Sequence, residues 1–338
     1  MDENQIFEAA KAGAERMKAF EQREKIANER NRNEMTVLLD LVNSVLKKYS
    51  IADTVSNQHI KFYSDYIGNI SDLKNKKLSE LIFNKYFPPP SLKTYYHYTS
   101  LAAAESIIVN KTLRLSNLLK RFNDGEYRTF YDDHGMDGYM VGGTVLGVDT
   151  GERAIMKDIY FLSLTSLAFD FAGETKWLNF GDHGHGVRLE FEITPKHDDF
   201  REVYYSLYQN ENCIPLLKEL FAEIKAAYGI PFNFSYSSKI GAFYIKGPFE
   251  NEKEFRFLVK TTADNYKASH IQPVITDEDN QIAYIELPFS SEFADFKLIS
   301  IQPGYNCSEN DIKCINELVM NHDSSIQVYT KGVEYIVF

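Results

Sequence analysis

The sequence predicts a mixed α+β protein, because many strand-like segments follow a helical first third. Aromatic residues are abundant, with 24 Phe and 22 Tyr but one Trp in 338 residues, and such rings favour strands and stacking sites. The strand-like segments have few helices between them, which is typical of an α+β sheet and not of a doubly wound one. The clearest strands are expected at 159–163, 186–193, 242–246, 254–260, 282–286 and 296–301.

The first part of the chain predicts helices. Apolar residues recur at helical spacing over 6–20 and, more strongly, over 37–46. A third helix fits 73–86 and stops at three consecutive prolines, which cannot continue a helix. We therefore expect a helical region over residues 1–90 and a second domain over 91–338.

The second domain contains further expected elements and one long loop. Segment 94–99 is rich in β formers, and a loop rich in Gly and Asp runs over 123–151. Long loops in compact domains are often functional lids. The remaining expected elements are helices at 101–110, 214–228 and 309–320, and extended pieces at 112–116 and 325–329.

Charge and cysteine content restrict the class of protein. The net charge of −11 opposes general polyanion binding, since non-specific affinity for nucleic acid comes from basic residues, although a local basic groove still allows a nucleic-acid substrate. Three cysteines without metal spacing predict a reducing compartment. No run approaches the ~20 apolar residues of a membrane helix, and the first twenty residues lack the apolar core of a signal peptide. We expect a cytoplasmic protein without membrane association.

Several common motifs are missing from the sequence. It has no Walker loop, no glycine fingerprint for dinucleotides, no zinc-protease histidine pair and no serine elbow. His183 and His185 lie in the segment GDHGHG. A metal there is conceivable, but no carboxylate or Cys set has ligand spacing, so a glycine-rich turn is favoured and no metal is expected.

Three segments carry residue types suited to a site. The first is YYHYTS at 95–100, with His97 among β formers; the second is FLSLTS at 161–166, followed by an aromatic loop. The third is EKEFRF at 252–257, where strand alternation puts both Glu residues and the Arg on one face and both Phe residues on the other. Each has a plainer interpretation: a strand histidine, a turn with a core tryptophan, and a solvated edge strand.

The order of these motifs resembles a known family. YHYTS, LRLS, FNDGE, a serine strand, a Trp loop and EKEFR follow one another, as in a bacterial family of formerly uncharacterised domains from phage-defence and toxin loci. That family is similar to mono-ADP-ribosyltransferases of the His-Tyr-Glu and Arg-Ser-Glu types, including the RNA-modifying toxin of a toxin–antitoxin–chaperone system. The resemblance runs from about Tyr95 to the carboxyl terminus and does not cover the first ninety residues.

The resemblance implies an ADP-ribosyltransferase-like fold with a split mixed β-sheet core. It implies NAD as substrate, a macromolecular acceptor (RNA or protein), and an antitoxin or chaperone as a possible partner. His97 would contact the ribose of NAD, with Tyr98 and Thr99 beside it. Glu254 would be the catalytic glutamate and Glu252 the preceding acid, with the choice between the two left open.

Further residues would complete the implied pocket. Ser163, Thr165 and Ser166 would support it, and Trp177 or Phe180 would supply the aromatic face for nicotinamide. Arginines bind pyrophosphate through charge-assisted hydrogen bonds. Arg114 or Arg256 would serve here, unless Arg256 only neutralises a neighbouring Glu.

Two other functions fit the same sequence. The first is an NAD glycohydrolase with water as acceptor. The second is a non-catalytic binding or sensor module, with the amino-terminal helices holding a partner or only packing on the second domain. Replacing Glu254 with Gln is expected to abolish activity and preserve the fold, because an exposed strand-face carboxylate contributes little stability.

Overall fold

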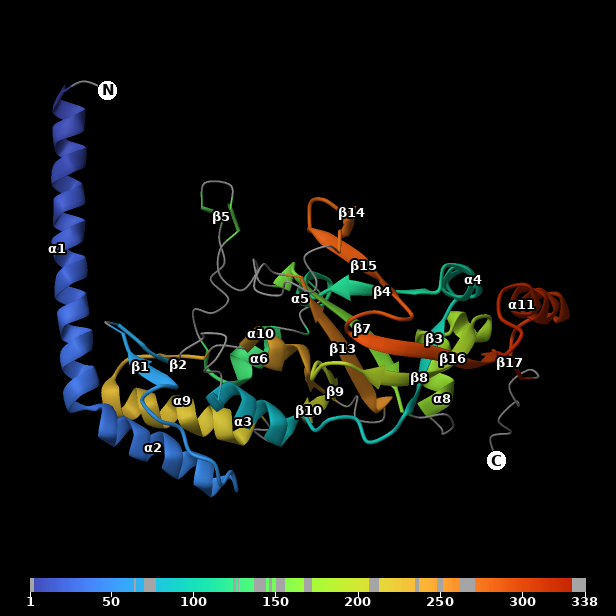
Figure 1. Cartoon of the computed structure of the whole chain (residues 1–338), viewed down its shortest axis with the longest axis horizontal. Coiled ribbons are helices and arrows are strands. Elements are labelled where there is room, and N and C mark those ends of the chain that lie inside the picture. Colours follow the sequence, from blue (N-terminus) through green and yellow to red (C-terminus); the bar gives the residue numbers. More distant parts are fainter. Residues whose placement is uncertain are drawn as a thin grey trace. The chain divides into compact units, whose positions relative to one another are not determined.

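The protein has two compact units (Figure 1). The first unit consists of Met1–Tyr86, Asp133–Gly135 and Cys213–Ser237, and the second of Phe87–Asp132, Met136–Asn212 and Ser238–Phe338. The structure, a computed structural model, describes residues 3–63, 65–69, 77–123, 126, 128–136, 144–145, 148–149, 156–166, 172–206, 213–234, 237–247, 252–261 and 271–329. Part of the predicted 123–151 loop and part of the predicted 73–86 helix lie outside these residues.

The first unit contains more than the predicted helices. Its elements are α1 (Glu3–Asn33), α2 (Met35–Lys48), β1 (Ile60–Phe62), β2 (Ile67–Asn69), α3 (Lys77–Tyr86), α9 (Pro215–Tyr228) and β11 (Phe232–Asn233). The strands β1, β2 and β11 form a small sheet. Helix α9 contacts α2, and Lys48 pairs with Glu219 at 2.6 Å. Residues 213–237 therefore belong with the amino-terminal helices, whereas the sequence prediction placed them in the second domain.

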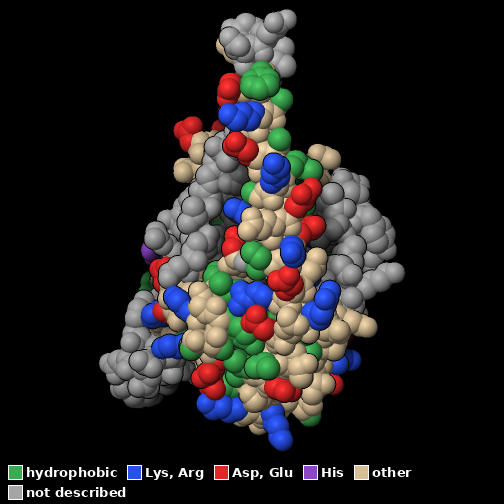
Figure 2. All heavy atoms as spheres, turned by 90° about the vertical axis from the view of Figure 1, so that its left-hand side faces the viewer, with side chains coloured by type: hydrophobic (Ala, Val, Ile, Leu, Met, Phe, Trp, Pro, Cys, Tyr) green, Lys and Arg blue, Asp and Glu red, His purple; other side chains and the backbone are tan. Residues whose placement is uncertain are grey.

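Helix α1 continues through the polar stretch after residue 20. Its end is fixed to β1 by Asn31, whose side chain donates to Phe62 O at 2.8 Å and accepts from Phe62 N at 2.9 Å. The side chains from residue 10 to residue 26 are all exposed. Figure 2 shows hydrophobic and charged side chains interspersed along this helix.

The second unit is built on one large mixed sheet, which confirms the α+β prediction. The sheet order is β14-β15-β4-β7-β3-β8-β16-β17, and β13 pairs with β7 and with β9. Its strands are β3 (Thr94–Thr99), β4 (Thr112–Asn117), β7 (Ile159–Thr165), β8 (Val187–Pro195), β9 (Phe200–Glu202), β13 (Glu254–Lys260), β14 (Val274–Asp277), β15 (Ile282–Pro288), β16 (Ala294–Pro303) and β17 (Gln327–Val328).

Helices and short strands surround this sheet. They are α4 (Leu101–Asn110), α5 (Leu119–Asn123), α6 (Arg128–Asp133), α8 (Ala172–Asn179), α10 (Ser237–Ala242), α11 (Glu309–His322), β5 (Thr144–Val145), β6 (Val148–Asp149), β10 (Tyr204–Ser206) and β12 (Tyr244–Lys246). Helix α4 begins at Ser100, whose side chain accepts from Ala103 N, and α11 begins with a capping box between Ser308 and Asp311. None of the described helices is long and apolar enough to cross a lipid bilayer.

Strand β7 lies where the sheet divides. One edge of β7 pairs with β13 along its whole length, from Ile159 to Thr165. The other edge pairs with β4 at residues 160 and 161 and with β3 at Thr165 alone. The middle of β7 around Ser163 therefore faces a gap between two neighbouring strands, and the candidate site is built there.

Candidate active site

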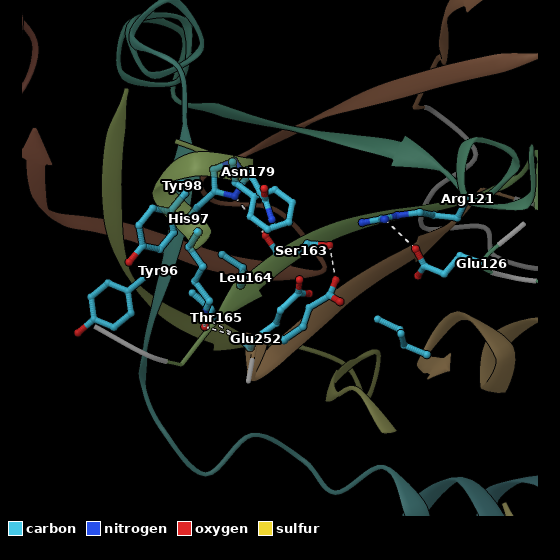
Figure 3. A pocket seen from close by; sticks show the side chains of 14 residues that line it. Tyr96, His97, Tyr98, Arg121, Glu126, Ser163, Leu164, Thr165, Asn179 and Glu252 are labelled. Carbon is cyan, nitrogen blue, oxygen red and sulfur yellow. Dashed lines mark hydrogen bonds and ion pairs between the residues drawn. The ribbon is translucent and has the colours of Figure 1, made fainter. Parts of the chain in front are cut away.

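A cavity of about 380 Å³ lies in the second unit, beside the division of the sheet (Figure 3). This volume is within the range of small-molecule sites. His97, Ser163 and Glu254, which are remote in the sequence, reach it from strands β3, β7 and β13. The lining side chains are those of Tyr96, His97, Tyr98, Arg121, Glu126, Ser163, Leu164, Thr165, Lys176, Asn179, Phe180, Ile245, Glu252 and Glu254.

The register of β7 and β13 brings the polar groups together. Arg256 lies opposite Ser163, and Glu254 lies opposite Thr165. Since side chains alternate between the two faces of a strand, these four side chains share one face. The intervening phenylalanines of β13 enter the hydrophobic core. Because β13 has β7 on one side and β9 on the other, the solvated-edge interpretation of this segment is wrong.

Glu254 is buried and ionised. Its side chain accepts from Arg256 Nε at 2.8 Å and Nη2 at 3.1 Å, and from the Ser163 hydroxyl. Burial by itself would raise the pKa of Glu254, but Arg256, Arg121 and the Ser163 hydrogen bond outweigh it and hold the pKa below its ordinary value. The sequence prediction of an exposed carboxylate at this position is wrong, because β13 is an interior strand.

Glu252 has the opposite electrostatic environment. It lies before the start of β13, and Lys253 between the two carboxylates has a φ of +44°, so strand alternation does not extend to it. Its carbonyl accepts from Lys176 Nζ at 2.6 Å and Thr165 Oγ1 at 2.8 Å. Burial and the nearby Glu254 charge raise the pKa of Glu252. The cavity thus holds two carboxylates whose pKa values are displaced in opposite directions, as in acid–base pairs.

His97 fills the gap beside the middle of β7. Its Nδ1 lies 3.1 Å from Ser163 O, and because a carbonyl only accepts hydrogen bonds, Nδ1 carries the proton. Burial lowers the pKa of His97, with a partial offset from this hydrogen bond. The ring is therefore neutral near pH 7, and its Nε2 is an acceptor.

The two candidate aromatic residues have different places. Phe180 lines the cavity with 48% of its surface exposed. Trp177 is 6% exposed and does not line it. Trp177 packs edge-on against Tyr98, with ring centroids 5.0 Å apart, on helix α8 and not in the predicted loop. The core interpretation is thus correct for Trp177, and of these two rings Phe180 is the one that a ligand in the cavity can contact.

Three other predicted site residues lie outside the cavity lining. Arg114 pairs with Glu286 at 3.2 Å and is 56% exposed. Thr99 ends β3, and its carbonyl lies so close to Gly186 that a Cβ there would be 2.1 Å away. Ser166 follows β7 and donates its backbone N–H to Lys253 O at 3.3 Å. The structure thus gives no support to ligand contacts from these side chains.

Three charged lining residues were not predicted. Arg121 and Glu126 come from α5 and the segment after it, and Lys176 comes from α8. The FNDGE motif, which ends at Glu126, was the available indication of a turn or lid here. The alternative that Arg256 neutralises a neighbouring Glu is correct, because Arg256 binds Glu254 at 2.8 Å. Nothing in the pattern indicated that it would also bind Glu126, at 2.7 Å.

The GDHGHG segment forms a turn. Asp182–Gly184 is a short 3₁₀ helix in which Asp182 and His183 have positive φ. Among the residues that the structure describes, no three His, Cys, Asp or Glu side chains are grouped as a metal site requires.

Comparisons with protein-family models, with curated proteins and with solved structures find no match to this chain.

Proposed function

We propose that this chain is an NAD-dependent mono-ADP-ribosyltransferase that acts as a toxin or defence effector on RNA or protein, with an ADP-ribosyltransferase-like split sheet as its core. One observation carries the proposal. His97, Ser163 and Glu254 come from three strands and line a single cavity, in the order and with the residue types that the family resemblance implies.

The charges of the cavity suit cleavage of the bond between nicotinamide and ribose. That bond breaks with its electron pair leaving on nicotinamide, and positive charge develops on the ribose, as in glycoside hydrolysis. An ionised carboxylate beside that carbon stabilises the charge. Glu254 supplies it, because its lowered pKa keeps it ionised at neutral pH. The Nε2 atom of His97 can accept a hydrogen bond from a ribose hydroxyl.

The acceptor must then lose a proton as its nucleophile bonds to the ribose. A base is effective when its pKa is raised towards the working pH. Glu252 has a raised pKa and lines the same cavity as Glu254. We propose that Glu252 takes the proton from the acceptor and that the ring of Phe180 packs against the face of the nicotinamide ring.

An assay with a matched control tests this function. Purified protein is incubated with NAD labelled in its adenylate part, together with RNA or lysate, and compared with Glu254→Gln and Glu286→Gln. Glu286 also accepts from an arginine but is outside the cavity. We expect Glu254→Gln to lose ~10²–10³-fold in rate and Glu286→Gln to stay at the wild-type rate.

Three results separate the alternatives. Label fixed to RNA or protein supports transfer, and free nicotinamide without a labelled acceptor supports the hydrolase. If the wild-type protein does not cleave NAD and calorimetry detects no NAD binding, both activities are contradicted and the non-catalytic binding module is favoured. Circular dichroism of both variants is needed, because Glu254 is buried against Arg256.

A further inference from the structure

Two arginines share one carboxylate at the cavity. Glu126 accepts from Arg256 Nη2 with Oε1 and from Arg121 Nη1 with Oε2, both at 2.7 Å. Arg256 also binds Glu254. Three charged side chains therefore connect α5 to the candidate catalytic carboxylate. Figure 3 shows the pairing of Arg121 with Glu126 at one end of the cavity.

The two guanidinium groups bind the same carboxylate, so two positive charges lie on either side of one negative charge. Arg121 and Arg256 each lie over the ring of Phe161, at 5.4 Å from its centroid. Their repulsion is weakly screened, since the Arg256 side chain is 2% exposed and Arg121 is 29% exposed. Glu126, itself 21% exposed, supplies the negative charge between them. Without it, Arg121 would be driven towards solvent.

We propose that Glu126 is a positioning residue of this cavity, which fixes α5 to strand β13 and holds the Arg121 guanidinium at the cavity wall. Arg256 binds Glu254 through Nε and Nη2 and uses Nη2 for Glu126 as well. The consequence for catalysis rests on the proposed function. Glu126 keeps Arg256 in place beside Glu254, and it keeps Arg121 in the cavity lining, where an anionic ligand can bind it.

The test compares Glu126→Gln with Glu286→Gln. Both changes remove a carboxylate that accepts from an arginine, but only the first is at the cavity. Hydrogen exchange of the α5 amides is measured by mass spectrometry on the full chain, and nicotinamide release is measured as kcat, KM and pH profile. We expect faster exchange in α5 and a ~10–100-fold lower kcat for Glu126→Gln, with both unchanged in Glu286→Gln.

The pH profile separates positioning from a loss of fold. Burial and Glu254 raise the pKa of Glu252, Lys176 and Arg121 oppose them, and Glu126 adds to the increase. In Glu126→Gln the Arg121 guanidinium also leaves the cavity wall, and its lowering of the Glu252 pKa is larger than the increase that Glu126 adds. The acid limb of Glu126→Gln should therefore move to higher pH. Glu126→Asp keeps the charge but its side chain is one methylene shorter. Its α5 exchange, kcat and acid limb should therefore lie between those of the wild type and those of Glu126→Gln. If Glu126→Gln does not fold, Glu126→Asp provides the same measurements.

Exchange in α5 and a kcat that match the Glu286→Gln control would overturn the positioning role. If the wild-type protein does not cleave NAD, the proposed function fails by itself. The exchange comparison then still decides whether Glu126 fixes α5.

Discussion

Two arginine–glutamate pairs of the same sheet have opposite environments. Arg256 and Glu254 on β13 have side chains only 2% and 8% exposed, whereas Arg114 on β4 and Glu286 on β15 are 56% and 42% exposed. The residue types are alike and both pairs are closer than 3.5 Å, although the first pair lies within one strand and the second joins two neighbouring strands. The difference teaches that burial separates a pair that belongs to a site from a surface pair: of these four residues, only Glu254 lines the cavity.

The largest effect should come from removing the buried cation. Arg256→Met leaves Glu254 and Glu126 without their shared partner, and breaking a buried pair on one side costs about 3–5 kcal/mol. Denaturant unfolding followed by the fluorescence of Trp177, the single Trp of the chain, reports on the second unit. Adding Glu254→Gln should restore part of the loss. A loss below about 1 kcal/mol for Arg256→Met would instead mean that water screens this pair as it does a surface pair.

A smaller effect should appear as pH dependence. The folded-state pKa of Glu254 is lowered, so in acid the unfolded chain binds more protons than the folded one. Its stabilisation is present above the unfolded-state pKa, near the ordinary 4.5, and is lost as the pH falls through the lower folded-state value. Unfolding free energies of wild type and Glu254→Gln should therefore converge in acid. A difference between them that does not change with pH would contradict an ionised Glu254.

The smallest effect should come from the exposed pair. Arg114→Met or Glu286→Gln should change the unfolding free energy by less than about 1 kcal/mol, because water and side-chain entropy offset the attraction. High salt should reduce this contribution further, and nicotinamide release should not change. The same denaturant series with and without added salt measures it. A loss as large as that of Arg256→Met would remove the distinction between the two pairs.

Much of the secondary structure was predictable, because it depends on local patterns. The strand expected at 254–260 is β13, and the helix expected at 309–320 is most of α11. The small strands β1, β2 and β11 were missed, since two or three residues give too little periodicity. The structure groups helix 215–228 with the first unit, whereas the sequence prediction placed this segment in the second domain. The apolar stripe of this helix can be seen in the sequence, but its packing against α2 cannot.

For the site, sequence patterns selected the correct segments better than the correct side chains. His97, Ser163 and Glu254 meet in one cavity, and their catalytic roles stay predictions. Thr99, Ser166 and Trp177 lie in the same segments but are outside the lining. The pairing of Arg256 with Glu126, separated by 130 positions, has no local pattern and was not predictable.

The sequence by itself determined most of the helices and strands and which face of β13 is polar, because periodicity and residue chemistry are local properties. Only the tertiary structure decided which carboxylate is ionised, which ring is exposed and which arginine is engaged. Those properties depend on burial and on partners that are remote in the chain. Burial lowers the dielectric around Glu254, whereas the Arg114–Glu286 pair is exposed to water.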